Sequence, residues 1–147
     1  DTMNAMGGNG ISMGFDQLIN GLQTGVVDGA ENNYPTYSSG QHYRYAKYYS
    51  RTEHLMIPEI LVFSKRQWEQ LSKEDQELIM SLAKEAQQRQ RELWYAMEEK
   101  ALADMKANGV EVIEVEDKEA LRDAVRPVWD KHGAQYAELI ERIQAVQ

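Results

Sequence analysis

Apolar residues recur at helical spacing along much of the chain, and they predict a protein rich in helices. Residues 15–22 place apolar side chains at the i, i+3, i+4 and i+7 positions of an amphipathic helix. Gly25 is well placed to end this helix. A helix tail is also predicted to end at Gly7, and two further helices are predicted after Glu116 and after Gly133.

The longest predicted element is a single helix that begins after Ser72 and runs to about Asn108. The stretch contains no glycine or proline, and Ser72 is a good N-cap residue. About 35 residues at 1.5 Å per residue make a helix roughly 50 Å long. Residues 87–91 are polar on every face, which is typical of a helix that bridges two parts of a protein through solvent. Glu85 and Arg89 can pair across one turn of this region, which adds only about 0.3–0.5 kcal/mol.

Strands are predicted where β-branched and aromatic residues cluster between the helices. The candidates are residues 11–13, 48–52, 59–64 and 110–113. Strands that alternate with helices favour an α/β fold. The chain is divided into part of an α/β lobe (residues 1–71), a long lobe-bridging helix (72–108), and a C-terminal strand with helices (109–147).

Composition and charge narrow the class of protein. The chain has 147 residues, of which 42% are hydrophobic, so one domain with a real core is possible. The net charge is −8 and no basic cluster offsets it, which argues against a nucleic-acid-binding surface. No apolar run approaches the roughly 20 residues that cross a bilayer. The absence of cysteine excludes disulfides and thiolate chemistry.

The chain begins at Asp1 rather than at methionine, and its first residues have the pattern of a helix tail. We therefore expect that a preceding part of the protein is not included. Under that expectation, the lack of a signal peptide says nothing about the compartment.

Motifs for catalysis, metal binding or cofactor binding do not stand out. The stretch GNGISM near the N-terminus begins like a phosphate loop, but it lacks the third glycine and precedes a predicted strand instead of following one. His42, His54 and His132 are scattered without metal-ligand spacing, so no metal and no other cofactor is predicted. Asp28 and Glu31 could flank a sugar as glycosidase carboxylates do, although an acid before glycine is an ordinary turn residue.

Phe15 and the pair Asn32 and Asn33 remain as candidates for a ligand site. Amide groups offer donors and acceptors, which suits a polyhydroxylated or carboxylate ligand that is bound rather than transformed. An aromatic ring offers a flat apolar wall to a sugar ring. Each residue also has an ordinary structural interpretation, as a core aromatic or as a turn residue. The pattern alone therefore leads to a two-lobed α/β fold without a function.

The stretch MGFDQLINGLQTGVVDGAENN, residues 13–33, resembles the central signature of the DctP-type substrate-binding subunits of tripartite ATP-independent periplasmic (TRAP) transporters. The resemblance continues through HYRYAKYYSRTEHLMIPEILVFSKRQWEQLSKEDQELI, the long helix and the GVEV segment, so it covers essentially the whole chain. Ser12, Gln17, Ile19 and Gly21 depart from the usual proline, glutamate, tyrosine and alanine. These departures concern the packing of the local helix more than the chemistry.

Members of this family are about twice as long, and the chain resembles their C-terminal half. The resemblance implies an α/β fold that is the C-terminal portion of a two-lobed periplasmic-binding-protein-like structure with one long lobe-spanning helix. It places Phe15 at the aromatic position that lines the ligand and Asn32 at the asparagine that hydrogen-bonds the ligand carboxylate. Asn33, followed by Tyr34 and Pro35, resembles the branch associated with uronic and other sugar acids. The arginine that pairs with the carboxylate lies upstream in the family and is absent from this chain, which is therefore expected to bind an acid weakly by itself.

We predict a periplasmic solute-binding protein, not an enzyme, that captures a small organic acid, specifically a hexuronate, for membrane-embedded TRAP transporter subunits. One alternative is an α/β carbohydrate-active enzyme that uses Asp28 and Glu31. Another is a helical interaction module that dimerises through the long helix, although residues 87–91 interrupt its heptads. Exposed apolar surface in such a chain is expected to permit non-native dimerisation or swapping.

Overall fold

The computed structural model describes residues 1–146, which form two compact units. The first unit comprises residues 1–30, residues 48–54 and the chain from residue 112 onward, and the second comprises residues 31–47 and 55–111. The division into residues 1–71, 72–108 and 109–147 refers to the lobes of a longer protein, and it stays a prediction.

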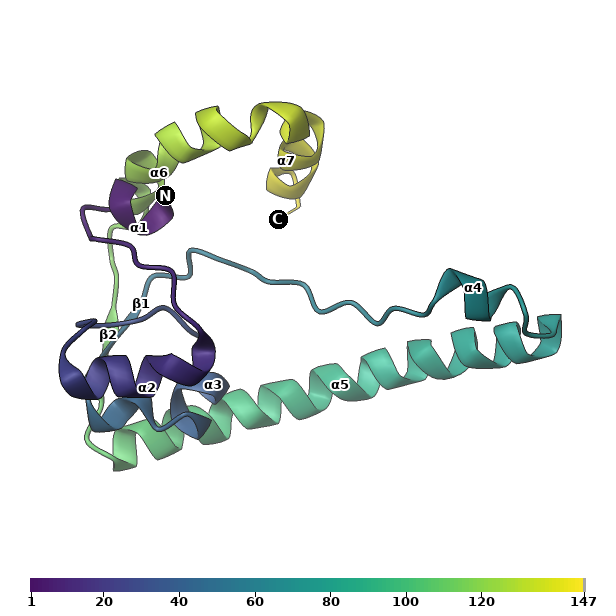
Figure 1. The fold of residues 1–147 in the computed structure, drawn as a ribbon, viewed down its shortest axis with the longest axis horizontal. Helices are drawn as coiled ribbons and strands as arrows, with labels where there is room; N and C mark the ends of the chain where they lie inside the picture. Colours follow the sequence, from purple (N-terminus) through teal and green to yellow (C-terminus); the bar gives the residue numbers. More distant parts are fainter. Residues whose placement is uncertain (147) are drawn as a thin grey trace. The chain divides into compact units, whose positions relative to one another are not determined.

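The first unit contains short helices around a strand pair. Its elements are α1 (Thr2–Ala5), α2 (Phe15–Thr24), β1 (Tyr48–Arg51), most of β2 (Glu111–Glu114), α6 (Lys118–His132), the 3-10 helix η2 (Ala134–Tyr136) and α7 (Ala137–Gln144). Helix α1 packs against α6, as Figure 1 shows. At this contact the carboxylate of Asp1 accepts hydrogen bonds from Lys131 at 2.9 Å and from His132 at 2.8 Å. The predicted helices of this unit are confirmed.

Helix α2 ends as the sequence predicts. Gly25 adopts a left-handed conformation with φ of 71°, and the N–H of Val26 donates to the carbonyl of Gly21 at 2.9 Å. Glycine adopts this conformation without the steric cost that a Cβ atom brings. Gly21 and Leu22 are the buried residues of α2. The apolar spacing therefore predicted the helix; of its four apolar positions Leu22 is buried and Leu18 and Ile19 are half-buried, whereas Phe15 is exposed.

Strands β1 and β2 form a two-stranded sheet. The carbonyl of Lys47 accepts from the N–H of Glu111 at 2.9 Å, and four residues further along β1 the side chain of Arg51 contacts that of Glu114 at 2.6 Å. Contacts that advance in the same direction on both strands indicate a parallel pair. The strands predicted at residues 48–52 and 110–113 are confirmed, the second with a shift of one residue.

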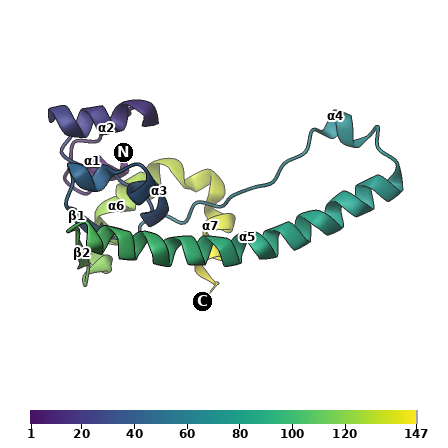
Figure 2. The same cartoon turned by 90° about the horizontal axis from the view of Figure 1, so that it is seen from below.

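The second unit is built on one long helix. Its elements are α3 (Tyr34–Ser39), the 3-10 helix η1 (His42–Arg44), α4 (Lys65–Trp68) and α5 (Lys73–Ala107). Helix α5 has 35 residues and begins at the predicted N-cap, where the hydroxyl of Ser72 accepts from the N–H of Asp75 at 3.1 Å. Figures 1 and 2 show α3 beside the C-terminal part of α5 and α4 near its N-terminus. In the polar middle of α5, Arg89 pairs with Glu92 at 3.0 Å, rather than with Glu85.

The packed interior of the second unit lies where α3 meets α5. Its buried apolar residues are Tyr37, Ala101, Met105 and Val110. Met105 has no exposed surface at all, and the N–H of Val110 donates to its carbonyl at 3.0 Å. This hydrogen bond closes the C-terminal end of α5, while the packing of α3 against α5 buries Tyr37 and Met105.

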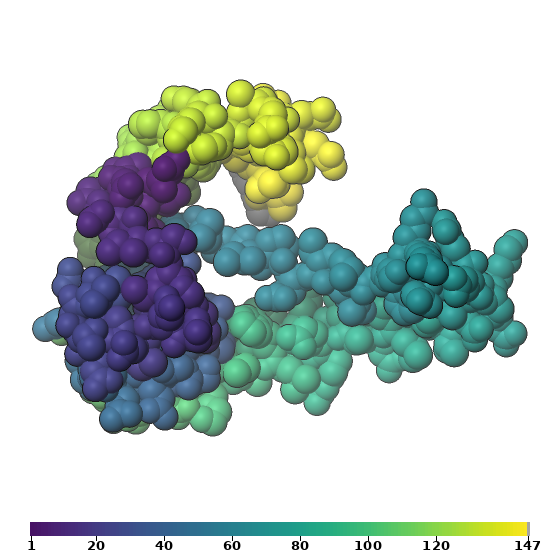
Figure 3. All heavy atoms as spheres, in the orientation of Figure 1, coloured from purple at the N-terminus to yellow at the C-terminus, as the bar shows by residue number. Residues whose placement is uncertain are grey.

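Two predicted strands are absent. Residues 11–13 and 59–64 are extended but do not pair with another strand of the described chain. The segment before α4 is a narrow teal band in Figure 3, and its residues Met56 and Leu61 are 95% and 80% exposed. A strand needs hydrogen-bonding partners for its N–H and C=O groups, and none lies beside residues 59–64 among residues 1–146.

None of the helices within residues 1–146 is both long and apolar enough to span a membrane.

Candidate functional site

Phe15 is the first residue of α2. The preceding residue, Gly14, is the N-cap and has extended backbone angles of −65° and 140°. The helix buries Gly21 and Leu22, one and a half turns or more away, and the Phe15 side chain is left 62% exposed. Phe15 is therefore not a core residue of the first unit.

Asn32 and Asn33 lead into α3 and have different structural roles. Asn33 is the N-cap of α3, and its Oδ1 accepts from the N–H of Thr36 at 2.9 Å. Asn32 Oδ1 accepts from the N–H of Asn33 at 3.0 Å. Both amide oxygens thus accept backbone hydrogen bonds. The amide Nδ2 groups are hydrogen-bond donors, and donors are what a carboxylate or hydroxyl oxygen of a ligand would need.

Helix α3, which follows the two asparagines, is held in place by buried side chains. Pro35 and Tyr37 of α3 are buried, and the Tyr37 hydroxyl donates to the carbonyl of Ala46. The Tyr37 ring makes an edge contact with buried His42, with 6.0 Å between ring centroids. Burial lowers the pKa of His42 and raises the pKa of Tyr37, so both groups are neutral near pH 7. Asn32 and Asn33 therefore start from a packed support rather than from a loose loop.

The candidate residues belong to different units. Phe15 lies in the first unit, whereas Asn32 and Asn33 lie in the second. The same holds for the alternative catalytic pair, with Asp28 in the first unit and Glu31 in the second, both exposed. The roles of these residues in one site stay predictions.

Each unit also has a hollow of its own. In the second unit, a hollow of about 430 Å³ between α3 and α5 is lined by hydroxyl, amide and charged groups that include Ser38, Tyr43 and Lys100. In the first unit, a mainly apolar hollow of about 380 Å³ lies along α6 and α7 at Trp129 and Ile140. Neither is lined by a residue predicted to bind ligand. Over residues 1–146, no group of three or more histidines and acids is arranged to hold a metal ion.

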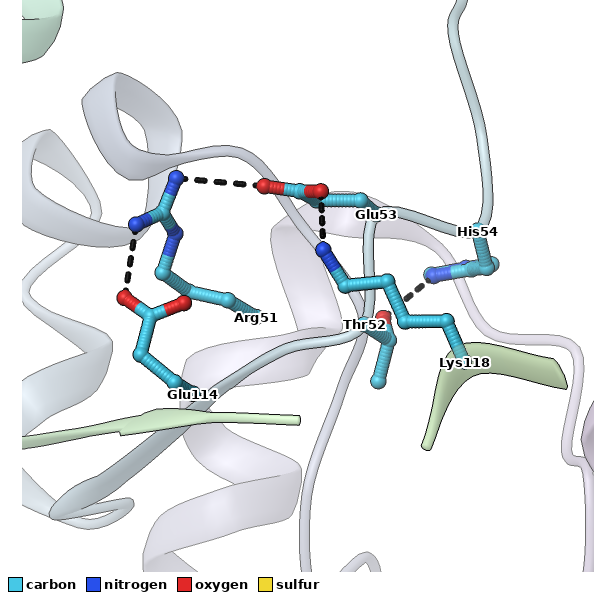
Figure 4. Close-up of polar contacts among 6 residues, drawn as sticks. All are labelled: Arg51, Thr52, Glu53, His54, Glu114 and Lys118. Carbon is cyan, nitrogen blue, oxygen red and sulfur yellow. Dashed lines mark hydrogen bonds and ion pairs between the residues drawn. The ribbon is translucent and has the colours of Figure 1, made fainter. Parts of the chain in front are cut away.

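A row of alternating charges at the ends of β1 and β2 is a feature that the sequence did not predict. Arg51 Nη1 donates to Glu114 Oε1 at 2.6 Å, and Arg51 Nη2 donates to Glu53 Oε1 at 3.1 Å. Lys118 Nζ donates to the other carboxylate oxygen of Glu53, as Figure 4 shows. We call these four residues the Glu53 clasp. Its halves are more than sixty residues apart in sequence, and no pattern in a single sequence pairs them.

The two cations around Glu53 have an electrostatic consequence. The hydrogen bond and positive charge of Lys118, together with the charge of Arg51, hold the pKa of Glu53 below its ordinary value. Beside the clasp, the hydroxyl of Thr52 and Nδ1 of His54 lie 2.7 Å apart. This contact agrees with the structural hydrogen-bonding role that is ordinary for a part-buried histidine.

Comparison with known proteins identifies the family. Residues 1–136 match family 7 of the bacterial extracellular solute-binding proteins, DctP. A solute-binding protein from Chromohalobacter salexigens is 40% identical over 142 residues, which are 97% of this chain and 42% of the relative. The 2,3-diketo-L-gulonate-binding periplasmic protein of Escherichia coli is 34% identical over 145 residues, with 96% of this chain and 44% of the relative covered.

Solved structures agree. A TRAP periplasmic solute-binding protein from Pseudomonas putida, with bound D-glucuronate, is 50% identical and has a TM-score of 0.92; the match covers 100% of this chain and 48% of that one. A similar protein from Sulfitobacter, with bound β-D-galacturonate, is 41% identical with a TM-score of 0.87, and the match covers 95% and 47% of the two chains.

The chain belongs to the DctP family of bacterial extracellular solute-binding proteins. Its fold is that of TRAP periplasmic solute-binding proteins, so the predicted family and α/β fold class are confirmed. The chain spans about half the length of the relatives that it matches, which confirms the expected twofold difference in length.

Proposed function

We propose that this chain is part of a periplasmic solute-binding protein that captures a hexuronate for TRAP-type transport. The observation that carries the proposal is the 50% identity, over the whole chain, to a protein solved with bound D-glucuronate. A second protein of the same kind, 41% identical, holds β-D-galacturonate. Both ligands combine one carboxylate with a polyhydroxylated ring.

The chemistry of the candidate residues supports this class of ligand. The Asn32 and Asn33 amides supply N–H donors for a carboxylate or hydroxyl, because their oxygens already accept backbone hydrogen bonds. Phe15 supplies an exposed aromatic ring suited to the apolar face of a sugar. The resemblance implies that the main salt bridge to the ligand carboxylate comes from an arginine upstream of this chain. Arginine is the side chain with the best geometry for pairing with a carboxylate.

The proposed mechanism is capture without turnover. Two lobes close around the acid, as in other hinged binding proteins, and the closed form presents the ligand to membrane-embedded transporter subunits. No step of this mechanism needs a nucleophile, a general acid or a metal ion. The protein is therefore proposed not to be an enzyme.

The test is a thermal-shift titration of a protein of the relatives' full length that contains this chain. D-glucuronate and D-galacturonate are compared with D-glucose, which has the ring but lacks the carboxylate. A ligand present at 100 times its Kd should stabilise the protein by about 2.7 kcal/mol. The acids are expected to raise the melting midpoint and glucose is not; a protein that responds to none of a panel of sugar acids would refute the proposal.

The same samples separate binding from catalysis. A glycosidase that uses Asp28 and Glu31 would cleave a uronide, whereas a binding protein returns its ligand unchanged. Chromatography of the ligand after incubation and release is expected to recover the intact sugar acid. Consumption of a uronide that is present in molar excess over the protein would favour the enzyme instead.

A further inference from the structure

The Glu53 clasp lies where the chain leaves one unit and enters the other. The chain passes from the first unit to the second after His54, and it returns to the first unit after Glu111. Arg51 and Glu53 stand just before the first of these passages, and Glu114 and Lys118 follow the second within seven residues. The ion pairs between them, drawn in Figure 4, therefore join the two segments of the first unit that border these crossings; the chain also crosses after Ala30 and after Lys47.

The backbone at Glu53 is unusual. Its φ is 48°, in the left-handed region that a residue with a Cβ atom rarely adopts. Glycine or asparagine would adopt this conformation at a lower steric cost than the glutamate that is present. The conformation persists with both carboxylate oxygens of Glu53 held, Oε1 by Arg51 and Oε2 by Lys118. The side-chain contacts and the backbone turn thus depend on each other.

The position of Lys118 supports the same interpretation. Lys118 is the first residue of α6, next to the N-cap Asp117. A helix N-terminus carries partial positive charge, so a lysine in this position is electrostatically unfavourable by itself. The carboxylate of Glu53 offsets both the lysine charge and the helix end. The pair is therefore specific to this location and is not an ordinary pair along a helix surface.

Exposed ion pairs one at a time contribute little, because water screens them and two flexible side chains must be ordered. The clasp differs because Arg51 connects to β2 and to Glu53 at once, and Glu53 connects onward to α6. Four side chains thus tie the ends of β1 and β2 to the start of α6. An alternating network of this kind restrains the backbone between its members more than an isolated pair does.

We propose that the Glu53 clasp is a positioning device that holds the crossing segment after β1 in one direction, and that Glu53 is thereby a positioning residue for ligand capture. The second part rests on the proposed function. The lobes can close around the ligand only in conformations where the crossing segments have a suitable direction. The apparent Kd rises as the fraction of free protein in those binding-competent conformations falls. A crossing held by the clasp keeps that fraction high without any contact between Glu53 and the ligand.

The first test needs no ligand. Backbone ¹⁵N order parameters of Thr52, Glu53 and His54 are measured in this chain and in its Glu53→Gln variant, which keeps the size of the side chain and removes its charge. Values are expected to be near about 0.85 in the unmodified chain and to fall below about 0.6 in the variant. Lys118→Gln leaves residue 53 intact and should lower them in the same direction.

The matched control is Glu69→Gln, which removes an exposed carboxylate paired with Lys65 at 3.7 Å on α4, outside the clasp. It should leave the order parameters of residues 52–54 unchanged. Unchanged values in both Glu53→Gln and Lys118→Gln, or an equal fall in the control, would overturn the proposal that the clasp holds this segment.

The second test measures D-glucuronate affinity in a protein of the relatives' full length. Glu53→Gln is expected to raise Kd by about 2–5-fold, as the loss of one exposed network member would give, through slower association, because a smaller fraction of the free protein is competent to bind. The melting midpoint without ligand should not change, and Glu53→Asp, which restores the charge, should recover part of the affinity. If residues 52–54 become mobile in the variant but its affinity for D-glucuronate is unchanged, only the positioning role in ligand capture is overturned. An unmodified protein that binds no sugar acid refutes the proposed function, and with it this role, while the first test still decides whether the clasp holds the segment.

Discussion

The neighbouring residues Asn32 and Asn33 should respond differently to substitution, because the structure gives them different tasks. The Asn33 side chain caps α3 through a 2.9 Å hydrogen bond from the N–H of Thr36. Replacing an N-cap asparagine by alanine costs about 1 kcal/mol of stability. Asn33→Ala should therefore lower the free energy of unfolding of this chain by about that amount in a urea titration followed by circular dichroism.

Asn32 makes a different contact, in which its amide oxygen accepts from the N–H of the next residue at 3.0 Å. Asn32→Ala should leave the unfolding free energy within about 0.5 kcal/mol of the unmodified value, as surface substitutions usually do. If Asn32 donates to the ligand carboxylate, the lost hydrogen bond to a charged group is worth about 1.5–3 kcal/mol. That loss raises the Kd for D-glucuronate by about 10–100-fold, measured by calorimetry in a protein of the relatives' full length.

Aspartate substitution separates capping from binding at position 33. Aspartate caps a helix as well as asparagine does, but it replaces the N–H donors by a negative charge. Asn33→Asp should therefore keep the stability of α3 and abolish binding of a sugar acid if Asn33 contacts the ligand. Asn20→Ala, an exposed asparagine on α2, is the matched control and should change neither quantity. Equal effects of Asn32→Ala and Asn20→Ala on affinity would refute the assignment of Asn32 to the site.

Three further predictions concern the second unit, each read from the midpoint of urea unfolding. Met105→Ala should destabilise by about 2–5 kcal/mol because Met105 is fully buried, whereas Met80→Ala on the same helix, at a side chain 51% exposed, should have little effect; equal effects would contradict the packing at α3 and α5. Ser72→Ala should cost about 1 kcal/mol by removing the N-cap of α5, and Ser81→Ala, an exposed serine inside α5, should be neutral or slightly stabilising. Lowering the pH from 7.5 to 5.5 should destabilise the unit through His42, because burial lowers its pKa and the unfolded chain then binds more protons than the folded chain. His42→Gln should reduce this pH dependence, and an undiminished slope would assign it to other groups.

The helices could be predicted from sequence because their signals are local. Ser72 caps α5, Gly25 ends α2 in a left-handed conformation, and Gly109 follows α5 with φ of 76°. Each of these signals depends on residues within one or two turns. The family, in contrast, came from the resemblance of residues 13–33 and beyond, because no pattern of charge or periodicity distinguishes a solute-binding protein from an α/β enzyme.

The clasp and the division of labour between the asparagines lay beyond the sequence for a physical reason. Glu53 and Lys118 are 65 positions apart, and ion pairs at such a distance depend on the path of the whole backbone. For Asn33, the sequence allowed a turn residue or a ligand contact, and the structure shows a helix N-cap. A cap and a ligand contact use opposite ends of the same amide group, so the structural role leaves the predicted binding role open to the aspartate test.

The wrong prediction of a strand at residues 59–64 shows what an apolar pattern encodes. Ile60, Leu61 and Val62 are 74%, 80% and 77% exposed, although three consecutive β-branched or large aliphatic residues are typical of a strand buried on both faces. On α5, Leu78 and Leu82 are also more than half exposed, at 56% and 52%. The pattern reports the burial for which these residues are suited, and a strand forms only where partners supply both its hydrogen bonds and its apolar cover. The self-association predicted from the sequence rests on such exposed apolar surface, and it stays a prediction.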